Sequence, residues 1–282
     1  MNRILAIEES ALSAYAESVK LERPGPEAAS NSGPSVGGVA RKPGSVVVYP
    51  ISGVIRSRGF AGYFGRVLGS DDHANNLEKL ANDPEVKAIV LDVNSPGGDV
   101  AGTPELAATI ASIRESKPIV ASVSPMAASA AYWLASQCTE ICCQPSGQVG
   151  SIGVILAHVS YEQYLNNEGV KITMITSGKF KGEGNPYQDL TEEARSRFQG
   201  LCDTIYSDFI SAVAKGRGVT PSVVKSDFGE GGMVLAKEAK GLGMIDRIET
   251  LSETMKRLGA TRQAGTKSKS LLAARHELVT LE

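Results

Sequence analysis

Residues 86–99, with the sequence VKAIVLDVNSPGGD, decide the fold class of this chain of 282 residues. The first eight residues are almost all apolar, which is typical of a strand that is covered on both faces of a parallel sheet. A turn with two adjacent glycines follows, and the spacing of apolar residues then predicts a helix over 103–115. A strand, a turn and a helix in this order form the repeating unit of an α/β fold.

The same alternation extends along the chain in both directions. Further strands are expected at 45–55, 119–123, 152–156 and 171–176, and further helices at 71–82, 127–137 and 161–167. Helical patterns then start at Thr191 and Thr220, and a strand, a short helix and a second strand are expected over 233–248. We therefore predict an α/β fold with a largely parallel, buried sheet and a helical C-terminal part.

The two ends of the chain differ from its centre. Apolar residues have helical spacing near the N-terminus, a stretch rich in Pro, Gly, Ser and Ala follows, and the C-terminal tail is basic without a sustained pattern. The expected division is an N-terminal helix with a flexible linker (1–43), a globular domain (44–258) and a mobile basic tail (259–282).

Composition excludes several classes of function. The 29 basic and 31 acidic residues give a net charge of -2, so no electrostatic argument favours nucleic acid or an anionic membrane as partner. The four cysteines form no CxxC pair, which is typical of reduced thiols and not of a zinc site. An uncharged stretch over 118–139 contains two prolines and is interpreted as buried core. With no secretory signal, we expect a cytoplasmic protein without membrane anchor, metal or cofactor.

Four segments at or near predicted strand ends could carry chemistry: the glycine turn at 94–99, the helix start at 125–132, the GSIGV segment with Ser151 at 150–154, and the lysine loop at 179–187. The glycine turn at 94–99 could direct backbone N–H groups at an anion, as an oxyanion hole requires. Ser129 starts a helix among alanines, where small neighbours would let a substrate approach its hydroxyl. Taken singly, each segment also fits an ordinary turn or close helix packing.

A nucleophilic serine needs a base, and the residues alone leave its identity open. The chain has three histidines, His73, His158 and His276, of which His158 lies nearest to a predicted strand end. A lysine serves equally well if desolvation lowers its pKa, and Lys179 and Lys181 lie in one loop.

Four motifs, in this order and spacing, resemble the signal peptide peptidase A (protease IV) family of serine proteases. They are NSPGG at 94–98, AASAAY at 127–132, GSIGV at 150–154 and KFK at 179–181. The resemblance covers roughly residues 45–250 and implies a ClpP/crotonase-like fold with a Ser–Lys dyad.

The resemblance also implies roles for individual residues. These are the nucleophile Ser129, the general base Lys181 with Lys179 as the nearest alternative, Ser151 as the hydroxyl that holds the lysine amine, and an oxyanion hole of Gly97 or Gly98 with Ala130. This chemistry needs no metal and no cofactor.

A narrower resemblance concerns the stretch around His158 and the sequence KGEGNPY at 181–187. Both look like the head-maturation proteases of lambda-type tailed phages and prophages. This branch implies a homo-oligomer that cleaves scaffold, portal or capsid proteins within an assembling prohead. The alternatives are a bacterial signal-peptide-peptidase-like protease, a catalytically idle assembly module on the same fold, and a crotonase-type acyl-CoA enzyme.

Overall fold

The computed structural model describes residues 4–7, 11, 41–62 and 65–260. Its strands are β1 (Ile4–Ile7), β2 (Ser45–Ser52), β3 (Phe60–Gly62), β4 (Gly65–Val67), β5 (Val86–Ser95), β6 (Gly97–Asp99), β7 (Ile119–Ala128), β8 (Glu140–Cys143), β9 (Gln148–Gly150), β10 (Ile155–Leu156), β11 (Met233–Leu235) and β12 (Arg247–Ile248). Its helices are α2 (Ser70–Asn82), α3 (Thr103–Ile113), α4 (Ala130–Ser136), α5 (Glu162–Asn167), α6 (Glu192–Arg217), α7 (Pro221–Asp227), α8 (Ala236–Gly241) and α9 (Leu251–Arg257).

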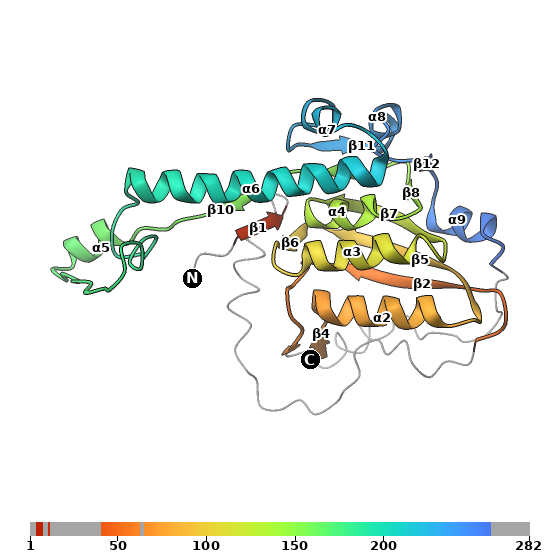
Figure 1. The fold of residues 1–282 in the computed structure, drawn as a ribbon, viewed down its shortest axis with the longest axis horizontal. Coiled ribbons are helices and arrows are strands. Elements are labelled where there is room, and N and C mark those ends of the chain that lie inside the picture. Colours follow the sequence, from red (N-terminus) through yellow and green to blue (C-terminus); the bar gives the residue numbers. More distant parts are fainter. Residues whose placement is uncertain (1–3, 8–10, 12–40, 63–64, 261–282) are drawn as a thin grey trace, which may run out of the picture.

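A seven-stranded sheet forms the centre of the fold. The order β11-β9-β7-β5-β2 is extended by β8, which pairs with β7, and by β12, which pairs with β8. Every pair except β11–β9 is parallel, and β5 and the first half of β7 are almost entirely buried. Helices α2, α3 and α4 lie side by side along the sheet (Figure 1). The predicted α/β class, the largely parallel buried sheet and the helical C-terminal part are confirmed.

Residues 157–201 project from the sheet, and we call this segment the arm. It includes the N-terminal part of α6, which connects it to the sheet. Thr191 caps this helix by accepting a hydrogen bond from the Ala194 N–H at 3.2 Å, as its sequence predicts. The C-terminal half of α6 packs on α4, where the Trp133 and Phe209 rings stack with centroids 4.5 Å apart. The N-terminal half extends beyond the sheet, and α5 lies at its far end (Figure 1).

Besides the strand expected at 152–156, which is limited to Ile155–Leu156, the structure differs from the expected elements at three places. Residues 171–176 pair with no strand in the described part of the chain, and Ile175 is 95% exposed. No strand forms here because strand-forming residues need a neighbouring strand to pair with. Helix α4 starts at Ala130 and not at Ala127, because the two preceding alanines continue β7.

The third difference concerns the N-terminus, where residues 4–7 form a strand and not a helix. This strand, β1, pairs antiparallel with β6 and β10, so partners from distant parts of the chain override its local helical spacing. The expected linker and basic tail lie outside the described residues, apart from their ends at 41–43 and 259–260. None of the helices in the described ranges has both the length and the apolar character needed to cross a bilayer.

Phe209→Ala tests whether the ring stack fixes α6 to the sheet. Phe209 is fully buried, so the loss of its ring is expected to lower the free energy of unfolding by about 3–5 kcal/mol. Denaturant unfolding measures the change. Ser211→Ala, at an exposed position of the same helix, should stay within about 0.5 kcal/mol of the unchanged protein, and equal effects of the two variants would contradict the role of the stack.

A partly buried ion pair fixes the C-terminal part to β8. The guanidinium of Arg217 donates hydrogen bonds to both carboxylate oxygens of Asp246, at 2.8 and 2.9 Å, and the Ile141 N–H donates a third at 2.7 Å. Burial alone would raise the pKa of Asp246, but these hydrogen bonds and the charge of Arg217 hold that pKa below its usual range.

Asp246→Asn should therefore change how stability depends on pH. Because the carboxyl pKa is lower in the folded state, its stabilising effect is present above the ordinary pKa of about 4 and is lost as the pH falls through the folded value. Urea unfolding at pH 7 and near pH 3 should show a smaller difference for the variant than for the unchanged protein. Asp208→Asn, at an exposed position of α6, is the control; the same pH dependence in all three proteins would contradict the prediction.

Candidate functional site

Ser129 lies between the end of β7 and the start of α4 in an uncommon backbone conformation. Its φ of 52° and ψ of -120° lie outside the regions that L-residues ordinarily adopt. Among the described non-glycine residues, Ser129, Ser151 and Glu230 have positive φ. Strained backbone of this kind gathers at functional sites, because the surrounding structure must compensate for its cost.

The pairing of β7 with β9 brings Ser129 and Ser151 together. Ala128 pairs with Gly150 in the parallel register, and each serine directly follows one of these two residues. The Ser129 N–H donates to the Gly150 carbonyl at 2.8 Å, and the Ser151 N–H donates to the Gly232 carbonyl at 2.7 Å. The segments that follow β7 and β9 therefore turn at the same position of the sheet, and both serines have a φ of 52°.

The glycine turn meets the start of α4 from the other side. Gly97 has a φ of 94°, and a Cβ on it would lie 3.0 Å from both the Ala128 oxygen and the Ala130 nitrogen. The Ala130 N–H is in the first turn of α4 and has no partner within that helix. The glycine turn and the start of α4 thus lie in close backbone contact beside Ser129, and the Gly97 N–H donates to the Ser95 hydroxyl at 3.2 Å.

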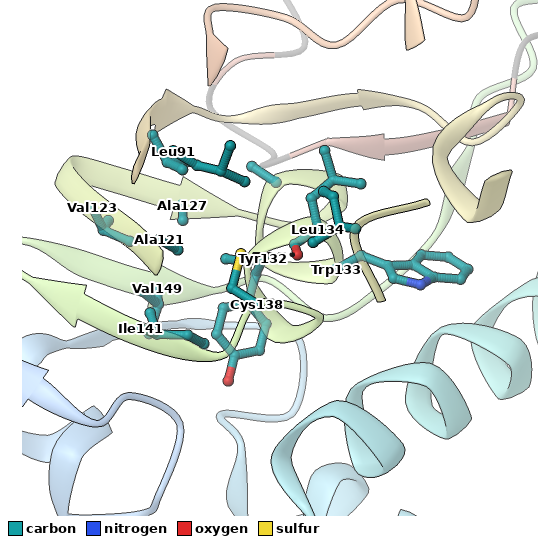
Figure 2. Close-up of a cluster of buried hydrophobic side chains, with 14 of the residues drawn as sticks. Leu91, Ala121, Val123, Ala127, Tyr132, Trp133, Leu134, Cys138, Ile141 and Val149 are labelled. Carbon is teal, nitrogen blue, oxygen red and sulfur yellow. Dashed lines mark hydrogen bonds between the residues drawn. The ribbon is translucent and has the colours of Figure 1, made fainter. Parts of the chain in front are cut away.

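Helix α4 is held tightly on all sides, which fixes the position of Ser129. All seven residues of the helix are buried. Figure 2 shows Trp133 directed toward α6 and the Tyr132 hydroxyl directed away from the sheet, where it donates to the Met244 carbonyl at 2.9 Å. The small residues of 127–131 thus have a packing role.

Lys181 is not brought to Ser129 within this chain. It lies in the arm and is exposed, and no hydrogen bond or ion pair among the described residues joins its side chain to either serine. The adjacent Phe180 ring packs under Arg197 of α6 at 3.7 Å, whereas α4 contacts the same helix at Phe209. Helix α6 rises about 18 Å between these two contacts.

Lys179 is held by a carboxylate. Its Nζ lies 2.8 Å from a carboxylate oxygen of Glu193, and this contact lowers the pKa of Glu193. This contact is exposed, and Lys181 is exposed as well, so the preference for Lys181 as the base rests on the resemblance to the family.

The histidines within the described ranges lie apart from the two serines. His73 is within 2.8 Å of the Tyr49 hydroxyl, and burial lowers the pKa of its imidazole. His158 is in the arm, where its Nε2 lies 3.0 Å from the Asn185 carbonyl. A Ser–His arrangement, which the residues alone left open, is therefore not formed here; His276 lies outside the described residues.

The cysteines offer no competing nucleophile. Cys138, Cys142 and Cys143 are buried and none of the described cysteines forms a disulfide. Burial raises the pKa of the Cys142 thiol to about 11 and that of Cys143 to about 12, so both stay protonated at neutral pH.

Comparisons with known proteins give a family and several relatives. The model of Peptidase family S49 matches residues 111–265, more than half of the chain. Capsid assembly protease C of Escherichia phage lambda is 35% identical over 205 residues, which are 72% of this chain and 46% of that protein. Head-tail preconnector protein GP5 of Enterobacteria phage P21 is 35% identical over 187 residues, 66% of this chain and 37% of that protein.

A bacterial relative extends the comparison. The putative signal peptide peptidase SppA of Enterococcus faecium is 30% identical over 205 residues, 72% of this chain and 59% of that protein. The chain therefore spans between 37% and 59% of the length of these three relatives.

Gly97→Ala tests the close approach at the glycine turn. A Cβ at this position would have nearby backbone atoms as neighbours and would also be strained by the positive φ, so we expect a loss of at least about 1 kcal/mol in the free energy of unfolding. Gly200→Ala is the matched control, because a Cβ there meets nothing within 4 Å and α6 should gain about 0.5–1 kcal/mol. A gain in both variants, measured by denaturant unfolding, would contradict the geometry described for the turn.

Proposed function

This chain belongs to peptidase family S49, and from that premise we propose that it is a serine endopeptidase with Ser129 as nucleophile and Lys181 as general base. The observation that carries the proposal is the conformation of Ser129, which is strained, directly precedes a helix and lies where the glycine turn closely approaches Ala130. The range matched by the family includes both proposed residues and Ser151.

The proposed reaction proceeds through an acyl-enzyme. The Ser129 oxygen attacks the carbonyl carbon of the scissile peptide bond while Lys181 Nζ takes the hydroxyl proton. The negative oxygen of the tetrahedral intermediate accepts hydrogen bonds from Ala130 and from Gly97 or Gly98. The C–N bond then breaks, and the leaving amine receives the proton from Lys181. A water molecule, deprotonated by the same lysine, hydrolyses the ester and restores Ser129.

The proposed site is completed by a second copy of the chain. Lysine accepts a proton only where its ammonium is desolvated, and the side chain of Lys181 is exposed in a single copy. The arm that carries it also exposes large apolar side chains, as an interaction surface does. These are Val159, Tyr161, Tyr164, Val170, Ile172, Met174, Ile175, Phe180, Tyr187 and Leu201. Association of arms in a homo-oligomer would cover these side chains and bring Lys181 of one copy to Ser129 and Ser151 of another.

The proposed substrates are proteins of an assembling phage head. Support comes from the two phage relatives, whose 35% identity exceeds the 30% of the bacterial signal peptide peptidase. Scaffold, portal or capsid proteins within a prohead would be the substrates. A role as a bacterial signal-peptide-peptidase-like protease is the second candidate, and its support is the relative from Enterococcus faecium.

Mixing two inactive variants tests the shared site. Ser129→Ala and Lys181→Ala should each abolish hydrolysis of dye-labelled casein, because each removes one reacting group. In an equal mixture of the two variants, about a quarter of the shared sites would take an intact Ser129 from one copy and an intact Lys181 from another. About a quarter of the activity of the unchanged protein should therefore return after the oligomers dissociate and reassociate.

Two controls make the mixing experiment decisive. Lys179→Ala should retain activity, because the proposal gives the role of base to Lys181 and Lys179 is paired with Glu193. Labelling of Ser129 by a fluorophosphonate, detected by mass spectrometry, separates an active enzyme from an idle module. No restored activity in the mixture, with active unchanged protein, would contradict the shared site; activity in purified Lys181→Ala would contradict the dyad.

A further inference from the structure

Strand β1 pairs with strands that are distant from it in the sequence. It pairs antiparallel with β6 through Ala6 and Gly98 and through Ile7 and Gly97, and it pairs with β10 on its other side. The three strands form a small sheet of their own, separate from the central sheet. Figure 1 shows β1 beside β6, near α4. The segment therefore lies between the glycine turn and the strand that follows Ser151.

The hydrogen bonds between β6 and Ile55 show which backbone groups of β6 point toward β1. The Ile55 N–H donates to the Gly97 carbonyl at 2.8 Å, and the Asp99 N–H donates to the Ile55 carbonyl at 2.9 Å. Successive backbone groups of a strand point to opposite sides, so the N–H and C=O of Gly98 face β1. Ala6 is the residue opposite Gly98, and its backbone thus meets an N–H that the proposed oxyanion hole would use.

The carbonyl of Ala6 lies in the candidate site itself. A Cβ on Gly97 would be 2.2 Å from the Ala6 oxygen and 3.0 Å from the Ala130 nitrogen, so both atoms are close to one point. Ser129 is 0% exposed and Ser151 is 9% exposed. A protein substrate cannot reach a nucleophile that is covered in this way.

The side chains of Leu5, Ala6 and Ile7 are buried, although they lie on both faces of β1. Leu5 and Ile7 form a small apolar cluster with Val54 and Ala11, whereas Ala6 joins the main core and is fully buried. The strand thus presents a small residue toward the core and aliphatic residues on the opposite face. This is how an extended peptide binds by adding a strand, with backbone hydrogen bonds for affinity and alternate side chains for selectivity.

We propose that the strand position between β6 and β10 binds the substrate and that residues 5–7 occupy it as an internal inhibitor. The proposal rests on the proposed peptidase function of Ser129. The substrate class is an extended peptide with a small residue, like Ala6, whose carbonyl faces Gly98 and Ala130, and with an aliphatic residue on each side. The inhibitory segment has four residues in its strand and can open locally while the central sheet stays folded.

The double variant Leu5→Asp/Ile7→Asp in the full chain tests the proposal. Burying two carboxylates in the apolar cluster is unfavourable, so the segment should leave its position. Fluorophosphonate labelling of Ser129 and casein hydrolysis should both become about tenfold faster or more. Amide hydrogen exchange at Gly98 and Ile155 should become faster, whereas exchange at Val90 in the central sheet should not change. Ile248→Asp, at an exposed strand position in β12, is the matched control and should behave as the unchanged protein.

A synthetic peptide gives an independent test of the same proposal. The peptide NRILAIEESA, which is residues 2–11, should slow labelling of the double variant and restore protection of Gly98. The same peptide with Ala6→Pro lacks the N–H that faces β6 and should do neither.

The outcomes separate this inference from the proposed function. Equal labelling and equal amide protection in the double variant and the unchanged protein would overturn the internal inhibitor. Loss of protection at Gly98 without labelling or hydrolysis in any variant would support the occupied position and overturn the peptidase function instead.

Discussion

The pairing of Ala128 with Gly150 is the constraint on which the candidate site depends. The parallel strands β7 and β9 end at this pair, and the segment after each strand turns at a serine with positive φ. Without the pairing, Ser129 and Ser151 would be unrelated residues of two loops. The burial of α4 on one side and the Gly232 carbonyl on the other hold the two turns in place, so the strain of both serines is compensated by packing and hydrogen bonds.

The sequence predicted those parts of the fold that local patterns determine. The buried strand at 86–93 and the glycine turn after it are evident because strand, turn and burial all leave a pattern in neighbouring residues. Residues 171–176 have a similar strand pattern, yet they are exposed, since pairing depends on a partner strand that the pattern does not reveal. Residues 4–7 show the converse, because β6 and β10 make a strand of a segment with helical spacing.

The residues alone indicated the glycine turn and Ser129 as separate candidates, and only the resemblance to a family combined them with a base into one site. Ser129 and Gly97 come from different strand ends, and their contact arises from the order of strands in the sheet, which the residues do not state. The resemblance combined these residues with Lys181. It did not indicate that Lys181 lies in an arm away from Ser129 in the same chain, since a motif gives sequence spacing and not the chain that contributes each residue.

The covered serine and the exposed lysine have one consequence when the two proposals are taken together. A single folded copy has no lysine at Ser129, the nucleophile is buried, and β1 occupies the proposed substrate position beside the glycine turn. Activity then requires association, which brings Lys181, and release of β1, which admits the substrate. The two events are physically independent, because β1 pairs with β6 and β10 whereas the exposed apolar side chains lie on the arm. The fraction of active enzyme is then the product of two populations, so a protease of this design stays inactive as a free chain even where one event occurs by chance.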